Sequence, residues 1–358
     1  MANIFCRSPY LIRIADTGQL GSKIELRIWR GYGGSAPTNP TYTLSKLIPA
    51  PTVYETLYNI SPYIKEFISH PFYFNVYNQV EQNNNDYEWA NVEVKSYKLT
   101  NEGYVLLSTV TYKAFDGYNE YLDGKNFDRG NYHLDEGIYL YEYDSNSSPS
   151  SNVLKRAGAV IWNGVIGNKV KYTELSTGNT QTFTITKDRS IMSYRVYPSY
   201  YSNGNIMQIL NASNTVLWES TFKPIVECKY TPVVIDFINK YGAWQREFFF
   251  KASKNTINVN STTYNLMQES VWNFDEQEGQ RKVFNSIMAE TIQVNSDWRD
   301  DNYSEVIRQL MMSERIFINN NPVKINTNSM EMFKQINTKM INYQLDFEYA
   351  YDINNTVV

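Results

Sequence analysis

Residues 340–352, MINYQLDFEYAYD, alternate regularly between apolar and polar side chains. The apolar positions are Ile341, Tyr343, Leu345, Phe347, Tyr349 and Tyr351. The polar positions between them are Asn342, Gln344, Asp346 and Glu348. A repeat of two residues is typical of a β-strand with one buried face and one wet face. The pattern therefore predicts a strand over residues 341–351.

The N-terminal third also has the pattern of short strands. Residues 23–29 alternate between apolar and polar side chains, with Ile24, Leu26 and Ile28 on one face. A Gly-rich loop over residues 31–37 follows this strand and ends it. Residues 42–44 predict a second short strand, and residues 61–68 predict one or two helical turns. In that helix we expect Ser61 as the N-cap and Pro62 at the first helical position.

Paired apolar runs on either side of short polar turns predict three hairpins. The first joins residues 91–97 to residues 104–112, around the turn at residues 101–103. The second joins residues 170–175 to 181–186, and the third joins residues 207–210 to 215–218. We interpret the second and third as parts of one small immunoglobulin-like block. The polar loop at residues 145–151, SNSSPSS, is a flexible connection before it.

The last block combines a helix with strands. Residues 303–314 predict a helix, because Val306, Ile307, Leu310 and Met311 recur on one helical face. Residues 315–318 and 322–325 then predict a hairpin around three asparagines, and the strand at residues 341–351 closes the block.

These elements predict a mainly β protein with immunoglobulin-like β-sandwich domains and a C-terminal sheet domain with one packed α-helix. The 358 residues are enough for two or three domains. We place an N-terminal sandwich-like domain at residues 1–158, a small immunoglobulin-like domain at 159–230, and the sheet-plus-helix domain at 231–358.

Composition supports a folded chain and disfavours some partners. Hydrophobic residues make up 42% and aromatic residues 15%, with 30 tyrosines, which suit half-buried sheet faces and interfaces. The net charge of −4 and the absence of a Lys/Arg cluster argue against sequence-specific nucleic-acid binding. The N-terminal residues lack the features of a signal peptide, and no apolar run approaches the roughly 18 residues of a membrane span. We expect no membrane partner.

The residues that usually perform catalysis or bind metals are scarce. The two histidines, His70 and His133, are expected in surface positions or loops, and the two cysteines, Cys6 and Cys228, are expected as free thiols. Neither a G-x-S-x-G nor an H-E-x-x-H motif occurs. We therefore expect no enzyme activity, no cofactor and no metal.

Two loops have weak alternative interpretations. The acidic loop at residues 116–131 holds Asp116, Glu120, Asp123 and Asp128, but its spacing departs from that of an EF-hand. An ordinary solvated turn is the simpler interpretation. The Gly-rich residues 31–34 lack the Lys and Ser/Thr of a phosphate-binding loop.

The densest aromatic cluster lies at residues 241–250, YGAWQREFFF. It predicts either a turn at Gly242 followed by a core strand, or an interface or sugar-stacking platform.

Several segments resemble tail proteins of phages that infect Bacteroidetes. The resemblance rests on residues 8–10, 21–26, 228–233, 237–245, 248–251, 303–314 and 341–352. It is best in the last third of the chain and poor in the middle. The family is that of the structural tail or tail-hub proteins of crAss-like gut phages.

The resemblance implies a non-enzymatic virion component that forms an oligomeric ring in the tail hub or neck. Its partners would be further copies of itself and neighbouring tail or neck proteins, with DNA passing through the lumen. The polar face of residues 341–351 is a candidate lumen wall, because acidic and amide groups would repel passing DNA. The protein would be made in the host cytoplasm and end in the virion tail. The alternatives are a carbohydrate-binding tail adhesin and, more remotely, a glycan-degrading enzyme.

Overall fold

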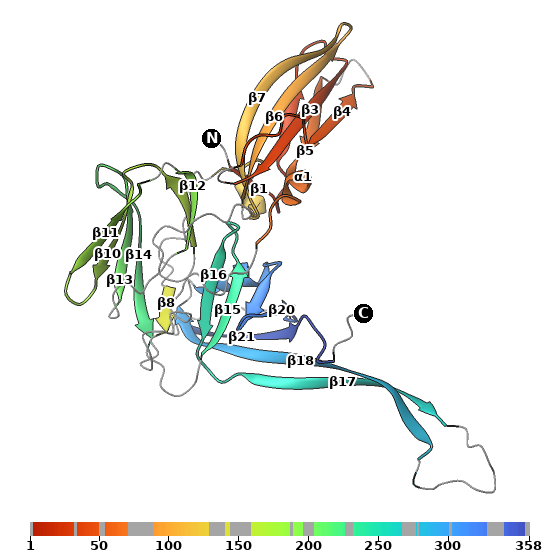
Figure 1. Cartoon of the computed structure of the whole chain (residues 1–358), viewed down its shortest axis with the longest axis vertical. Coiled ribbons are helices and arrows are strands. Elements are labelled where there is room, and N and C mark those ends of the chain that lie inside the picture. Colours follow the sequence, from red (N-terminus) through yellow and green to blue (C-terminus); the bar gives the residue numbers. More distant parts are fainter. Residues whose placement is uncertain are drawn as a thin grey trace. The chain divides into compact units, whose positions relative to one another are not determined.

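The computed structural model shows a mainly β protein (Figure 1), which confirms the predicted fold class. It describes residues 3–31, 34–49, 54–70, 89–128, 140–143, 159–186, 189–195, 204–225, 232–266, 277, 279–300, 303–327 and 340–354. The chain divides into two compact units. Unit 1 is Met1–Val226 with Phe237–Glu247, and unit 2 is Glu227–Asp236 with Phe248–Val358. The predicted boundaries at residues 158 and 230 lie outside the described residues, so the three-domain division stays a prediction.

Unit 1 begins with a five-stranded sheet in the order β1-β7-β6-β3-β4. Its strands are β1 (Asn3–Phe5), β3 (Gly21–Arg30), β4 (Tyr42–Leu47), β6 (Trp89–Thr100) and β7 (Gly103–Phe115). The predicted first hairpin is confirmed as β6–β7, and the predicted strands at residues 23–29 and 42–44 are confirmed within β3 and β4. Ile24, Leu26 and Ile28 are all buried, as their alternation predicts.

A small second layer covers one face of this sheet. The antiparallel pair β2 (Leu11–Ala15) and β5 (Glu55–Asn59), with the helix α1 (Ser61–Lys65), shares one apolar core with β3 and β6. The predicted capping role of Ser61 is wrong. The helix begins at Ser61 itself, and the Ser61 hydroxyl donates to the Ser8 carbonyl at 2.7 Å and accepts from the Tyr10 N–H at 2.9 Å.

The second sheet of unit 1 has the order β11-β10-β13-β14-β8. Its strands are β8 (Leu140–Tyr143), β10 (Lys169–Glu174), β11 (Thr180–Thr184), β13 (Asn205–Leu210) and β14 (Val216–Ile225). The predicted second and third hairpins are confirmed as β10–β11 and β13–β14. The strands β9 (Ala159–Gly164) and β12 (Arg189–Arg195) form a separate antiparallel pair. The predicted loop at residues 145–151 lies outside the described residues.

A seven-stranded sheet has the order β16-β15-β19-β20-β21-β18-β17. Its strands are β15 (Val233–Ile238), β16 (Trp244–Phe249), β17 (Lys254–Asn265), β18 (Arg281–Asp300), β19 (Ile316–Ile318), β20 (Asn321–Ile325) and β21 (Met340–Tyr349). The division into units cuts β15 after Asp236 and β16 after Glu247, so both strands have residues in each unit. The other strands of this sheet belong to unit 2.

The C-terminal predictions hold in unit 2 except at the end of the last strand, because β21 ends at Tyr349 and Tyr351, which was predicted on the buried face, is 48% exposed. Tyr343, Leu345 and Phe347 of β21 are buried, as the alternation of the segment predicts. The helix α2 (Tyr303–Met311) buries Val306, Ile307 and Leu310, but it ends three residues before the predicted end. The predicted last hairpin is confirmed as β19–β20, and its two turn residues, Asn319 and Asn320, both have positive φ. Such a turn matches the twist of the two strands.

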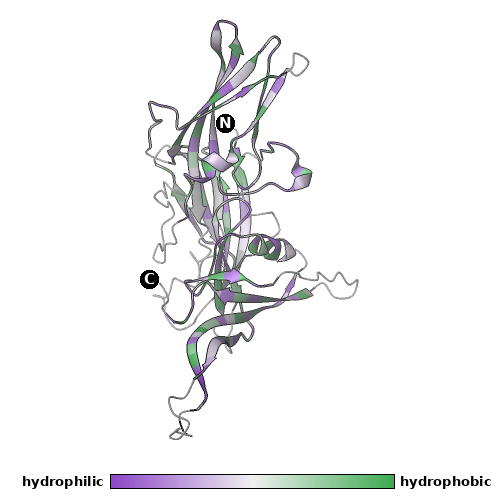
Figure 2. Ribbon diagram, turned by 90° about the vertical axis from the view of Figure 1, so that its right-hand side faces the viewer, coloured by the Kyte–Doolittle hydropathy of each residue, from purple (hydrophilic) through white to green (hydrophobic). Residues whose placement is uncertain are grey.

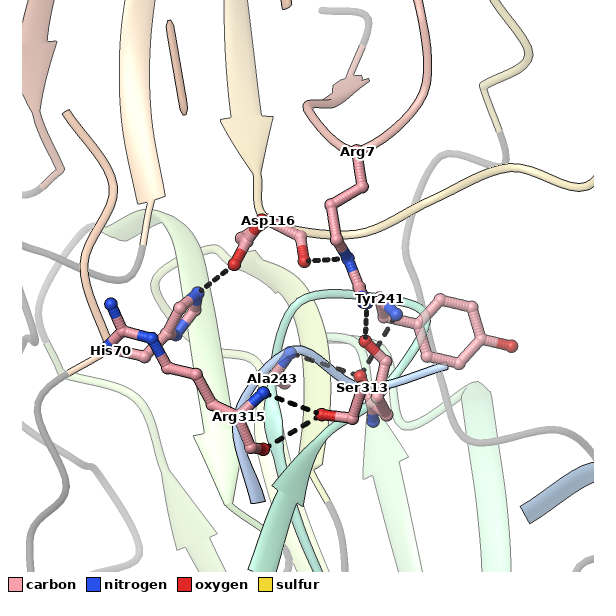
Figure 3. Close-up of polar contacts among 8 residues, drawn as sticks. Arg7, His70, Asp116, Tyr241, Ala243, Ser313 and Arg315 are labelled. Atoms are coloured by element: carbon pink, nitrogen blue, oxygen red, sulfur yellow. Dashed lines mark hydrogen bonds and ion pairs between the residues drawn. The ribbon is translucent and has the colours of Figure 1, made fainter. Parts of the chain in front are cut away.

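The turn that joins β15 to β16 packs within unit 1 against the first sheet. Asn239 organises the turn, because its side-chain carbonyl accepts from the N–H groups of Tyr241 and Ala243, each at 3.1 Å. Arg7 then binds two backbone carbonyls. Its guanidinium donates to the Asp116 carbonyl at 3.1 Å (Figure 3) and to the Asn239 carbonyl at 2.9 Å. The turn is therefore held by hydrogen bonds between backbone segments far apart in sequence.

Two glycines allow this contact. Gly242 has φ +82°, and a Cβ there would lie 2.8 Å from the Asp116 backbone. Gly117 faces it, and a Cβ there would lie 2.4 Å from the Lys240 carbonyl oxygen. Neither position has room for a side chain. Around the glycines, a small apolar cluster is formed by Phe5, Trp89, Phe115, Tyr241 and Ala243.

We expect the substitution Gly242→Ala to destabilise unit 1 far more than a positive φ alone explains. Gly178 is the matched control, because it has φ +74° and a Cβ added there would meet nothing within 4 Å. Gly178→Ala should cost about 1–2 kcal/mol of unfolding free energy. Gly242→Ala should cost about 1–3 kcal/mol more, because the added methyl overlaps backbone atoms. Urea unfolding of both variants measures the difference, and equal losses would contradict the close packing.

Candidate assembly interface

The strands β17 and β18 form a long ribbon in unit 2. Residues 291–300 of β18 pair with β21 on one side, whereas residues 281–290 have only β17 as a strand partner among the described residues. Figure 1 shows the ribbon continuing away from the other strands of its sheet. A two-stranded ribbon without a covering layer is at best marginally stable in water. Its length is thus a feature that the core of unit 2 does not require.

The outer edge of β17 is open. All twelve residues of β17 are exposed, and within the described part of the chain its only strand partner is β18. Lys254 is its only charged residue, so residues 255–265 carry no charge and no proline. Native sheets usually protect such an edge with charges, proline or a covering segment. None of these protections is present over residues 255–265 in the structure described.

Large apolar side chains are exposed on both strands of the ribbon. Ile257 and Val259 are 59% and 56% exposed, and Val283 and Phe284 are 59% and 77% exposed. The Tyr264 and Phe284 rings meet edge to face with centroids 6.5 Å apart. Figure 2 shows hydrophobic and hydrophilic residues interspersed along the ribbon. The exposed apolar residues suit a surface that a partner covers.

The C-terminal segment forms hydrogen bonds with β18, on the edge of the ribbon opposite to that of β17. The Ile353 N–H donates to the Met288 carbonyl at 2.9 Å, and the Asn354 side chain donates to the Ser286 carbonyl at 3.1 Å. These bonds occupy part of the second edge of β18. The open edge of the ribbon is therefore that of β17.

A second open edge lies in unit 1, on β7. The strand β1 pairs only with residues 113–115 of β7, so residues 104–112 have β6 as their one strand partner among the described residues. These nine residues, YVLLSTVTY, contain no charge. Exposed apolar side chains along them are Tyr104, Val105, Leu106, Leu107 and Val110. The hydrogen-bonding groups of this edge and its apolar side chains both lack cover in the part of the chain that the structure describes.

The other sheet edges are shorter or charged. The edge strand β4 has six residues and includes Lys46, and the edge strand β11 has five residues. Short edges and edge lysines are the usual protections against unwanted pairing. The open edges of β7 and β17 are longer than these and carry no charged residue over residues 104–112 and 255–265. We take the two edges together as the candidate assembly interface.

Sequence patterns predicted β7 but missed the ribbon. Residues 254–265, KNTINVNSTTYN, alternate Ile257 and Val259 with asparagine, which is a strand signal of moderate strength. The many polar residues hide it, because on an exposed ribbon neither face needs to be continuously apolar. The density of Thr, Val and Ile without Pro or Gly was the available signal.

A buried lysine lies on the outer face of the first sheet. The Lys113 ammonium donates to the side-chain amide oxygen of Asn91 at 2.6 Å and lies 4.4 Å from the centroid of the Trp89 ring. Burial disfavours its charge and lowers the pKa of Lys113 to about 8. The Asn91 side chain in turn donates to the Gly31 carbonyl at 2.9 Å. These contacts fix the lysine in the sheet beside the turn of residues 239–243.

Of the two histidines, the structure describes His70. His70 lies in a loop, as expected, but it is buried and not on the surface. Its Nε2 lies 3.4 Å from the Asp116 carboxylate (Figure 3), and its ring meets the Trp244 ring edge to face. Both neighbours belong to unit 1. His133 lies outside the described residues.

The acids of the loop at residues 116–131 have separate local contacts. Glu120 and Asp123 form a reciprocal capping box on the 3-10 turn Tyr121–Asp123. Asp128 accepts hydrogen bonds from Asn3. Within the residues that the structure describes, no three His, Cys, Asp or Glu side chains gather as metal ligands would. Cys6 is a buried free thiol, and burial raises its pKa, whereas Cys228 lies outside the described residues.

The aromatic cluster at residues 241–250 is a turn followed by a core strand. Gly242 makes the turn, and all six residues of β16 are buried. Trp244, Phe248 and Phe249 are at most 6% exposed. An exposed stacking platform is therefore wrong for this cluster, whereas the carbohydrate-binding interpretation, which rests on the tyrosine and tryptophan content of the chain, stays a prediction.

Comparisons with known proteins add no identity. No protein-family model matches the chain, and no curated protein matches it significantly. In the described part of the chain, no helix combines the length and apolar composition needed to cross a membrane. The candidate interface consequently rests on the geometry of the strands.

The buried Lys113 predicts a specific dependence of stability on pH. Its pKa of about 8 in the folded state is below the ordinary value of 10.5, so the unfolded state binds more protons between these values. Stability from this group should therefore rise with pH from about 8 to 10.5, by up to about 3 kcal/mol. The unfolding free energy of the wild type minus that of Lys113→Met should show this rise.

Urea unfolding at a series of pH values measures this difference. Other groups, including Cys6 and the tyrosines, are present in both proteins and cancel. Lys125→Met, at an exposed lysine, is the control and should leave the difference flat. A flat difference for Lys113→Met as well would show that its ammonium is not disfavoured by burial.

Proposed function

We propose that this chain is a non-enzymatic structural component of a bacteriophage virion. It forms part of an oligomeric ring in the tail hub or neck and connects tail parts around the DNA passage. Its partners are further copies of itself and neighbouring tail or neck proteins. It is made in the host cytoplasm and acts in the assembled virion.

The observation that carries this proposal is the pair of open, uncharged strand edges. Residues 104–112 of β7 and 255–265 of β17 expose backbone hydrogen-bonding groups beside apolar side chains. A protein that stays alone is selected against such edges, because they pair with other chains. A protein that assembles uses the same groups for binding. These edges therefore favour a function in assembly.

The resemblance to crAss-like tail and tail-hub proteins supports the choice of a virion ring. Three of its segments are the turn of residues 237–245, the helix region 303–314 and the strand region 341–352. In the structure these segments include the β15–β16 turn, α2 and β21. They are elements of the framework, as is expected of a resemblance between structural proteins.

The charge of the chain agrees with a passage for DNA. Asn342, Gln344 and Asp346 on β21 are exposed, and Glu348 pairs with Lys324 at 2.9 Å. An acidic, amide-rich wall would repel the phosphates of DNA and let it slide. That these side chains line the lumen is a hypothesis, which fails if they lie in a dry contact between subunits.

The ring is tested by the native mass of the purified protein. Light scattering on a sizing column should give a molar mass that is a whole-number multiple of 41.7 kDa. Negative-stain images of that peak should show rings. The oligomer should resist added salt, because uncharged strand edges rather than ion pairs would hold it. A chain that stays monomeric up to its solubility limit would contradict the proposal.

A further inference from the structure

We propose that the open edge of β7 in one copy pairs with the open edge of β17 in the next copy. The contact joins residues 104–112 of the first chain to residues within 255–265 of the second. This inference rests on the proposed ring and names the surfaces that form it.

An extended strand is the occupant that these edges require. Each edge presents backbone N–H and C=O groups at the spacing of a β-strand, with one register shift in β7 between Leu106 and Ser108. A helix or a folded loop satisfies its own backbone groups and cannot pair along nine successive residues. Only another strand of similar length completes the row.

The two edges of this chain fit each other in length and charge. At about 3.4 Å per residue, the nine residues of β7 span about 31 Å and the eleven of β17 about 37 Å. Because neither stretch contains a charged residue, pairing buries no unpaired charge. The β-branched Ile257 and Val259 suit packing beside the apolar side chains of β7.

The stoichiometry also favours this partner. Every copy carries one β7 edge and one β17 edge, on different strands of different units. A contact between two different surfaces is heterologous, and it forms a ring when the repeated rotation closes and an open filament when it does not. Pairing of each edge with its own kind would instead give two-fold contacts, which do not produce a simple ring.

Two single substitutions block the two edges separately. Leu106→Lys places a charge on β7, and Val259→Lys places one on β17. The replaced side chains are 51% and 56% exposed, so each isolated chain should still fold. A lysine at either position would place a charge among the apolar side chains of the joined strands, which should weaken self-association by about tenfold or more. Val216→Lys is the control, because Val216 is 47% exposed on β14, which is neither of the two edge strands.

Mixing the two blocked variants gives the decisive result. Each variant alone should be monomeric at a concentration at which the wild type forms its oligomer. An equimolar mixture should form one-to-one dimers of twice 41.7 kDa and nothing larger. The intact β17 of the β7 variant then pairs with the intact β7 of the β17 variant, and the remaining edges are both blocked. Sedimentation velocity measures these masses.

Other results overturn the inference in distinguishable ways. If each variant alone forms dimers, every edge pairs with its own kind. If both variants still assemble like the wild type and the Val216→Lys control, the ring stands but uses other surfaces. If the wild type itself is monomeric, the proposed function fails together with this contact.

Discussion

Strand pairing is the constraint on which this structure depends. A strand within a sheet satisfies its backbone groups only through neighbours on both sides. The chain supplies both neighbours to β3, β6 and β21, and these strands carry the most regular buried positions. It supplies only one neighbour to residues 104–112 and 255–265 among the described residues. Among the described residues, the backbone groups of the inner strands are therefore paired on both sides, whereas those of residues 104–112 and 255–265 are paired on one side only.

The β15–β16 turn shows how tightly the completed part is specified. Gly117 and Gly242 bring two backbone segments closer than any side chain permits, and Arg7 donates to carbonyls of both segments. Such contacts cannot be replaced by rearranging side chains, because the atoms in contact are backbone atoms. Their precision contrasts with the ribbon, where twelve residues of β17 are exposed. The backbone contact at this turn and the exposed ribbon are thus the most and the least enclosed parts of the described structure.

Local patterns were enough to predict about half of the strands but not their neighbours in the sheets. The alternation in residues 23–29 and 341–351, and the turns of four hairpins, were all visible because they depend on nearby residues. The order β16-β15-β19-β20-β21-β18-β17 depends on pairs far apart in sequence, which no local pattern reveals. For that reason the pairing of β21 with both β18 and β20 was not predicted. The burial of His70 likewise follows from a distant aspartate and tryptophan.

The distribution of charge separates the faces of the first sheet from its open edge. Lys23 and Glu25 meet at 2.7 Å on β3, and Arg27 meets Glu93 of β6 at 2.6 Å. These pairs cover the outer face of neighbouring strands, whereas the adjacent residues 104–112 of β7 carry no charge. A charged face stays hydrated and resists stacking against another sheet, while a neutral edge accepts a strand. The proposed contact therefore uses backbone pairing at the edge of β7 rather than stacking of this charged face.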